Sequence, residues 1–318
     1  MLVASAGVRE HRAMPADARD SRSPSASDTS RDVCDDEATQ TVELLRVDEA
    51  AGAKLRADQV VVEEPLEIQL GSVSLAVVMR TPGHDLELVR GFLAGERVVS
   101  SPDEIESIRH CTRAAHADAI DNVVRVVLRP GVEVDLESLR RNLFASSSCG
   151  ICGKATVDNA LAMAAPLEDG ARIVASRLPE MAEALLDAQD VFARTGGLHG
   201  AALFDANGSC KVVREDVGRH NAVDKAIGWA LERGEVPLSG HALMVSGRVS
   251  FEIVQKALAA RLPVVAAVSA PTSLAIDAAA RAGIALIGFV RGHSFNVYTA
   301  PERVVLGDLR PTNPRGSS

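Results

Sequence analysis

The last third of the sequence alternates between short apolar runs and stretches of helical periodicity, and this alternation constrains the fold most. A strand followed by a helix and another strand favours a parallel sheet covered by helices. Ligands of such sheets bind outside the carboxyl ends of the strands. The expected strands are 242–245, 264–268 and 284–290, and the expected helices begin at Ser250 and span 274–282, with Gly283 as the C-terminal cap.

The residues before this run predict a hairpin and a helix. Two apolar stretches, 198–204 and 210–214, flank a turn-rich segment that contains Asn207 and Gly208. Residues 220–233 have apolar side chains on one helical face and end at Gly234. We therefore expect a mixed, largely parallel sheet in the C-terminal part of the chain.

The N-terminal half has a different pattern. β-Branched or alternating runs at 60–62, 66–70, 73–79 and 123–128 are typical of an antiparallel sheet, and residues 84–96 have helical spacing. The fold class predicted for the whole chain is α/β, with a smaller α+β N-terminal domain. The expected organisation is a disordered tail over 1–40, the α+β domain over 41–145 and the α/β domain over 146–312.

Composition excludes several function classes. The net charge is −9 and only 3% of residues are aromatic, so neither nucleic acid nor an anionic membrane surface is an expected partner. No apolar run is long enough to span a bilayer, and no signal peptide is evident, so we expect a cytoplasmic protein. Five cysteines, at positions 34, 111, 149, 152 and 210, are too few and too unevenly spaced for a disulfide framework.

The sharpest local signal is the pair Cys149 and Cys152, with glycines at 150 and 153. Lys154 and a following helix N-terminus would lower a thiol pKa and favour the nucleophilic thiolate. Four interpretations stay open: a structural pair, a zinc site, a thioredoxin-like redox pair and a sulfur relay. Zinc would need two more ligands, but no second Cys-x-x-Cys, His-x3-5-His or His-x-Glu pattern occurs, so no metal site is expected.

A polar block from Arg214 to Asn221, followed by Asp224 and Lys225, lies just before and within the start of the expected helix. Ordinary capping by Asn221 or Asp224, with Arg219 in solvent, would explain one or two of these residues. So many charged groups together are better explained as the lining of a pocket. His199, considered alone, is more typical of a core histidine with its hydrogen bonds satisfied.

Three loops follow the expected parallel strands, at 246–250, 269–273 and 289–294. The first two open helices, whose free N–H groups suit phosphate oxygens, and Arg248 and Arg291 add charge. Neither a GxGxxG nor a Walker motif is present, so an ordinary dinucleotide or ATP site is not expected.

Four segments together resemble the formate dehydrogenase accessory sulfurtransferases, the FdhD family. They are CGICG at 149–153, DVGRHNAVDK at 216–225, SGR at 246–248 and GFVRGHSFNVY at 288–298. The resemblance extends from about residue 41 to about residue 306. It implies a cytidine deaminase-like C-terminal domain without the zinc site, and a homodimer.

The resemblance also implies an activity. Proteins of this family take sulfur from a cysteine desulfurase and transfer it to the bis(molybdopterin guanine dinucleotide) molybdenum cofactor, their bound substrate, before it enters formate dehydrogenase. Cys149 then carries the persulfide, with Cys152 as its partner. The expected cofactor-binding residues are Phe289, Val290, Arg291, Gly292, His293 and Ser294, together with Ser246, Gly247, Arg248, Arg219, His220 and Lys225. The alternative is a non-catalytic chaperone that binds the cofactor.

Overall fold

The computed structural model describes residues 37–111, 121–136, 139 and 165–307, all within one compact unit that spans 33–318. The predicted cysteine site at 149–152, the predicted domain boundary near 145 and nearly all of the predicted tail lie outside the described residues. Thr39 already begins a strand, so regular structure starts slightly before the end of the predicted tail.

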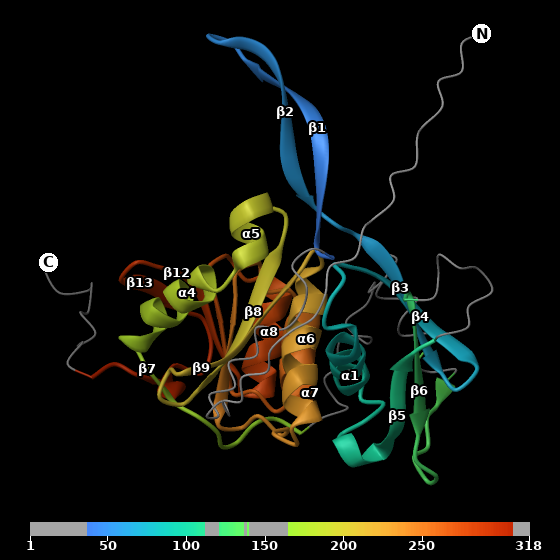
Figure 1. Ribbon diagram of the computed structural model, residues 1–318. Coiled ribbons are helices and arrows are strands. Elements are labelled where there is room, and N and C mark those ends of the chain that lie inside the picture. The colour runs from blue at the N-terminus through green and yellow to red at the C-terminus, as the bar shows by residue number, and fades with distance from the viewer. Residues whose placement is uncertain (1–36, 112–120, 137–138, 140–164, 308–318) are drawn as a thin grey trace, which may run out of the picture. The chain divides into compact units, whose positions relative to one another are not determined.

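A six-stranded mixed sheet forms the centre of the C-terminal part (Figure 1). Three neighbouring strands, β10, β11 and β12, are parallel, and the other three pairings are antiparallel. The sheet is therefore mixed, as predicted, but it is not largely parallel. The order is β13-β12-β11-β10-β8-β9. The strands are β8 (His199–Asp205), β9 (Cys210–Asp216), β10 (His241–Val245), β11 (Val264–Ala267), β12 (Ala285–Arg291) and β13 (Ser294–Val297).

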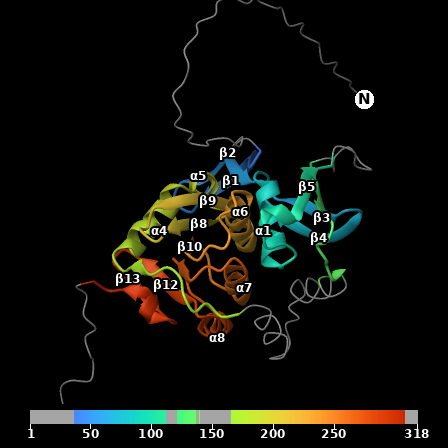
Figure 2. The same cartoon turned by 90° about the horizontal axis from the view of Figure 1, so that it is seen from below.

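Helices cover both faces of this sheet (Figures 1 and 2). Alternate strand residues bury their side chains in two different hydrophobic clusters, because successive side chains of a strand point to opposite faces. One cluster is completed by α6 (Arg219–Glu232), α7 (Phe251–Ala259) and α8 (Ser273–Ala282), and the other by α4 (Arg177–Asp187). A short helix, α5 (Asp190–Thr195), follows α4.

The N-terminal part contains a four-stranded sheet with the order β4-β3-β6-β5. Its strands are β3 (Glu64–Leu70), β4 (Val73–Arg80), β5 (Ile105–His110) and β6 (Val123–Leu128). The helix α1 (Asp85–Gly95) and a 3-10 turn (Pro102–Glu104) lie between β4 and β5 in the chain. The predicted antiparallel sheet needs correction, since β3 and β6 run parallel. Sequence order could not reveal this, because β3 and β6 are separated by two strands and a helix.

The two parts share one hydrophobic core. Residues of β3, β6 and α1 belong to the same buried cluster as residues of α6, α7 and the main sheet. At the contact between α1 and α6, a β-carbon on Gly91 would overlap the carbonyl oxygen of Asp224, and one on Gly228 would overlap that of Glu87. Glycine at both positions lets the two backbones approach closely.

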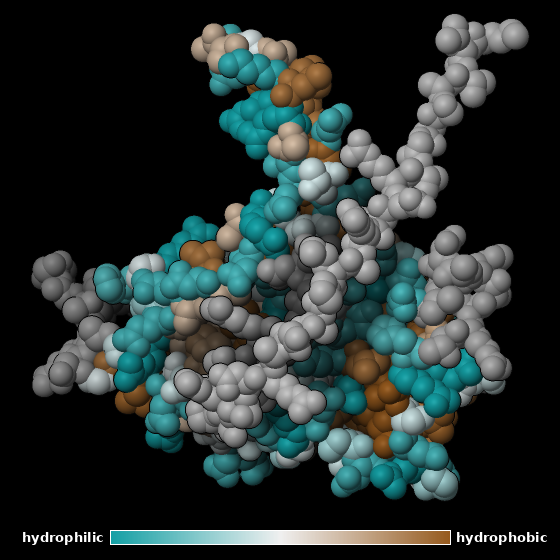
Figure 3. All heavy atoms as spheres, in the orientation of Figure 1, coloured by the Kyte–Doolittle hydropathy of each residue, from teal (hydrophilic) through white to brown (hydrophobic). Residues whose placement is uncertain are grey.

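A two-stranded ribbon, β1 (Thr39–Asp48) and β2 (Gly52–Val61), precedes both sheets in the chain. Leu45 pairs with Leu55, and Val47 pairs with Ala53 on the same face. Leu45, Val47 and Leu55 are exposed, and Figure 3 shows hydrophobic residues on the ribbon surface. The short strands β7 (Ile173–Val174) and β14 (Val304–Val305) pair in parallel, and a 3-10 turn (Pro301–Arg303) precedes β14.

Within the part of the chain that the structure describes, no helix is long and apolar enough to cross a membrane.

Candidate functional site at the carboxyl edge of the main sheet

One edge of the main sheet gathers most of the predicted site residues. β10, β11 and β12 end there, because they are parallel. β8 begins and β9 ends there as well, since β8 pairs antiparallel with β10, and His199 lies opposite Asp216. Segments far apart in the sequence therefore meet at this edge, as expected for an open α/β sheet.

The loop after β10 is held by the neighbouring strand. Ser246 N donates to Gly200 O at 2.9 Å, and Ser246 Oγ accepts from Gly200 N at 2.8 Å. Gly247 is buried, and a β-carbon there would lie 3.1 Å from His199 Nδ1 and 3.7 Å from Arg219 Cβ. The side chain of Arg248 is exposed. Ser246 thus fixes the loop, and Gly247 leaves room for the neighbouring basic side chains.

His199 and Arg219 both lie next to Gly247. Burial lowers the pKa of His199, and the positive charges of Arg219 and Arg248 lower it further. Arg219 Nε is buried and has no hydrogen-bond partner in the described structure. The polar surroundings of His199 therefore differ from those of the satisfied core histidine considered from the sequence.

His220 occupies the first turn of α6 and faces the start of α7. Its Nε2 lies 2.9 Å from Ser250 Oγ and 3.8 Å from Glu252 Oε2. Burial and the charge of Arg219 lower the pKa of His220 to about 4, so the ring is neutral at neutral pH. Sequence reasoning missed Ser250 and Glu252 as site residues, although a serine that opens a helix with an acid in its first turn was visible.

Lys225 does not lie free at this edge. Its Nζ pairs with Asp216 Oδ2 at 2.7 Å and donates to the carbonyl oxygens of Thr81 and Glu215. Lys225 and Asp216 are 1% and 0% exposed, so the three donors of the ammonium are used inside the protein. The structure therefore gives Lys225 a role in joining β9, α6 and the segment after β4, in place of the predicted contact with a ligand.

The capping interpretation of the polar block is wrong. The N-cap of α6 is Gly218, without a side-chain cap. Asn221 Nδ2 donates to Met79 O and Asp216 Oδ1, and Asp224 accepts from Lys256 Nζ at 2.8 Å. Burial raises the pKa of Asp224 to about 6, against the opposing effect of Lys256. Asp216 and Asp224 therefore connect different elements of the core.

The segment from Phe289 to Ser294 forms the end of β12 and its turn into β13. Phe289 has a φ of 55° and is 37% exposed, whereas Val290 is buried in the core beside α4. Arg291 Nε donates to Val268 O at 3.2 Å, and its guanidinium lies 5.7 Å from the Phe289 ring centre. Of these three predicted site residues, Phe289 and Arg291 are accessible to a ligand in solution, whereas the side chain of Val290 is buried.

The remaining residues of this turn are also at the surface. Gly292 has a φ of 51°, in the left-handed region that glycine adopts without strain. His293 and Ser294 are exposed, and Ser294 Oγ donates to Arg291 O at 3.3 Å.

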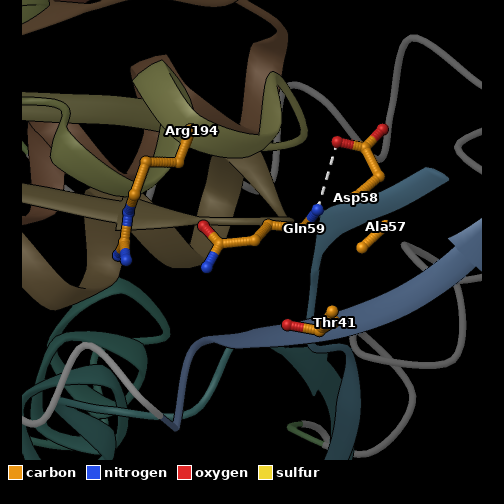
Figure 4. A pocket seen from close by; sticks show the side chains of 5 residues that line it. All are labelled: Thr41, Ala57, Asp58, Gln59 and Arg194. Atoms are coloured by element: carbon orange, nitrogen blue, oxygen red, sulfur yellow. Dashed lines mark hydrogen bonds between the residues drawn. The ribbon is translucent and has the colours of Figure 1, made fainter.

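A separate cavity of about 460 Å³ lies at the ribbon (Figure 4). Thr41, Ala57, Asp58, Gln59 and Arg194 line it. Asp58 Oδ1 accepts from Gln59 N at 3.1 Å. The cavity shares no residue with the predicted site.

Two cysteines lie within the described structure. Cys111 is half-buried, and Cys210 is at the surface where β9 begins. Partial burial raises the pKa of the Cys210 thiol, which disfavours its thiolate.

Comparison with known proteins identifies the family of this chain. The model of the FdhD/NarQ family matches residues 61–305. This chain belongs to the FdhD/NarQ family. Proteins named "Sulfur carrier protein FdhD" include one from Mycobacterium tuberculosis, 49% identical over 79% of this chain and 95% of that protein. Another, from Streptomyces coelicolor, is 47% identical over 84% of this chain and 96% of that protein.

A solved structure has a fold similar to that of this chain. The crystal structure of a candidate formate dehydrogenase accessory protein from Desulfotalea psychrophila covers 84% of this chain and 99% of its own, with a TM-score of 0.66. Its sequence identity is 24%, so the likeness concerns the fold alone. The mixed α/β architecture predicted from the sequence is confirmed.

Proposed function

We propose that this FdhD-family protein is a sulfur carrier in formate dehydrogenase maturation, with Cys149 as the residue that carries the sulfur. The observation behind the proposal is its membership of a family whose curated relatives are named sulfur carrier proteins. The sequence supplies a thiol pair at 149 and 152 with the spacing that such chemistry uses.

The transfer begins with attack of the Cys149 thiolate on the terminal sulfur of a cysteine desulfurase persulfide. The donor S–S bond breaks, the donor leaves as a thiolate, and a new S–S bond forms on Cys149. The terminal sulfur is then passed to the cofactor. Where it leaves as sulfide, Cys152 supplies the two electrons by forming a disulfide with Cys149, and a cellular dithiol reduces that bond.

The bis(molybdopterin guanine dinucleotide) cofactor is the proposed sulfur acceptor, bound as a substrate at the carboxyl edge of the main sheet. Phe289 offers an exposed aromatic face for a guanine base. Arg248 and Arg291 offer guanidinium groups for phosphate. Ser246, Gly247 and Gly292 shape the backbone around them.

We also propose that the C-terminal domain has a cytidine deaminase-like fold and that the protein is a homodimer in the cytoplasm. It should make direct contacts with a cysteine desulfurase and with formate dehydrogenase.

Peptide mass spectrometry tests the sulfur-carrying step. After incubation with a cysteine desulfurase and cysteine, the peptide that contains Cys149 should gain one sulfur atom. Cys149→Ser should abolish this gain and formate dehydrogenase activation, whereas Cys210→Ser, at a surface thiol of raised pKa, should change neither. Normal activation by Cys149→Ser, or no gain of sulfur, would favour the rival function of a cofactor-binding chaperone.

A further inference from the structure

Four basic side chains lie near one another at the carboxyl edge. His199 begins β8, Arg219 and His220 begin α6, and Arg248 lies between β10 and α7. Gly247 lies against both His199 and Arg219. The electrostatic influence of Arg219 reaches both histidines, and that of Arg248 reaches His199. We refer to these four side chains as the basic cluster.

The two arginines of the basic cluster have no carboxylate partner of their own, although Glu252 lies near His220 and feels the charge of Arg219. Among the described residues, no carboxylate forms an ion pair with Arg219 or Arg248, and Arg219 Nε is buried without an acceptor. Asp216, the acid opposite His199, is already paired with Lys225 and accepts from Gly218 N. A buried guanidinium nitrogen without an acceptor favours an oxyanion as its missing partner.

The hydroxyl and the acid nearest to His220 both come from the start of α7. From α7, Ser250 Oγ contacts His220 Nε2 instead of capping the helix, and Glu252 lies farther away, at 3.8 Å from the same nitrogen. Lys256, also from α7, and His199, from β8, add positive influence. Ser250 therefore engages Nε2, so a direct contact of His220 with an anion would have to use Nδ1.

Protonation of the cluster should depend on whether an anion is present. Burial and the neighbouring cations lower the pKa of both histidines in the free protein, that of His220 to about 4. A bound dianion would oppose those cations and stabilise the imidazolium forms.

We propose that His199, Arg219, His220 and Arg248 form an oxyanion site, and that an anion bound there takes up protons with it. This inference deepens the proposed function, on which its biological ligand rests: the anion is a phosphate group of the guanine nucleotide part of the cofactor. The site itself is independent of sulfur chemistry.

Sulfate is the probe for this site, because its charge stays constant across the pH range of interest. Calorimetry at constant ionic strength should show that sulfate affinity increases as the pH falls from about 8 toward about 5, approaching tenfold per pH unit for each proton taken up. The sign follows from the histidines, whose pKa values are lowered when the site is empty and should rise when an anion binds. Heats measured in buffers of different ionisation enthalpy give the number of protons directly.

Variants then assign the effect to the cluster. His199→Asn/His220→Asn should bind sulfate with little pH dependence, and Arg248→Gln, at an exposed position, should weaken binding about tenfold or more. His241→Asn is the matched control, since His241 begins β10 at the opposite edge of the sheet and burial lowers the pKa of its ring too. Thermal unfolding of each variant checks that the fold is intact.

Two results would overturn the proposal: sulfate binding without proton uptake, or a pH dependence that persists in the double histidine variant. A parallel experiment with GDP identifies the ligand class, and competition between GDP and sulfate is expected. Absence of that competition would reject the nucleotide as the source of the anion. Persulfide formation on Cys149 is measured separately, so failure of sulfur transfer and failure of this site are distinguishable.

Discussion

Lys225 Nζ lies 2.7 Å from Asp216 Oδ2 in an ion pair that is closed to solvent. Lys225 also donates to Thr81 O, and Asp216 accepts from Thr81 N. The pair thereby joins the middle of α6, the end of β9 and the segment that leads from β4 into α1.

Removing one member of this pair should destabilise the fold. Lys225→Met leaves a buried carboxylate without its counter-charge, at an expected cost of about 3–5 kcal/mol in the free energy of unfolding. Asp216→Asn/Lys225→Met should cost less than Lys225→Met alone, because no isolated charge remains. Urea unfolding at neutral pH provides the comparison. If Lys225→Met were as stable as the parent and bound GDP more weakly, Lys225 would be a ligand-binding residue after all.

Added volume at the α1–α6 contact should also be costly. In Gly91→Ala or Gly228→Ala, the new methyl group meets a backbone carbonyl of the other helix, which cannot rotate away. We expect the free energy of unfolding, measured by thermal or urea unfolding, to fall by about 3 kcal/mol or more. Gly240→Ala is the control, because nothing lies within 4 Å of its added β-carbon. Equal stability of the three variants would contradict the close helix contact.

His84 should make the fold sensitive to acid. Burial, followed by the charges of Arg214 and Lys225, lowers the pKa of His84 to about 3. The unfolded chain, with a histidine pKa near 6.5, binds more protons between these values, so stability is lost as the pH falls from about 6.5 toward about 3.

The expected loss from His84 at about pH 5 is about 1–2 kcal/mol, allowing for partial solvent screening. His84→Asn should reduce this pH dependence, and asparagine tolerates the φ of 57° at this position. Urea unfolding at several pH values measures the slope. An unchanged slope in His84→Asn would assign the acid sensitivity to other groups.

Phe289 and Val290 should respond differently to truncation. Phe289→Ala removes an exposed ring and should weaken GDP binding by about 1–3 kcal/mol while leaving the melting temperature nearly unchanged. Val290→Ala removes a buried side chain and should lower the melting temperature instead. Equilibrium dialysis with GDP and thermal unfolding separate the two effects. A loss of nucleotide affinity in Val290→Ala without loss of stability would argue against this division.

Local sequence signals predicted the C-terminal fold well. The strands near 242, 264 and 284 and the helix ending at Gly283 occur as expected, because their periodicity and caps are encoded within each segment. α4 was not predicted as an element, and only the end of the ribbon, within the predicted run 60–62, was. In α4, Leu178, Met181 and Leu185 do carry a helical pattern, whereas the ribbon exposes leucine and valine side chains where a core strand would bury them.

The candidate site could be predicted only in part. Residue type and strand-end position indicated Arg219, His220, Arg248 and the segment after Phe289, and the structure brings the first three close to His199. Sequence could not reveal that Asp216 would pair with Lys225 or Asp224 with Lys256, because these contacts depend on how α1, α6 and α7 pack. A charged block in a sequence does not distinguish groups that meet a ligand from groups that hold the core together.

The hydrophobic core also ties the two parts of the chain together. Leu139 and Leu167 are both buried in the cluster that the two parts share, and Arg303 Nη2 donates to Leu167 O at 2.9 Å. Unfolding of either part would expose apolar surface of the other, so both parts should lose their structure in a single cooperative transition.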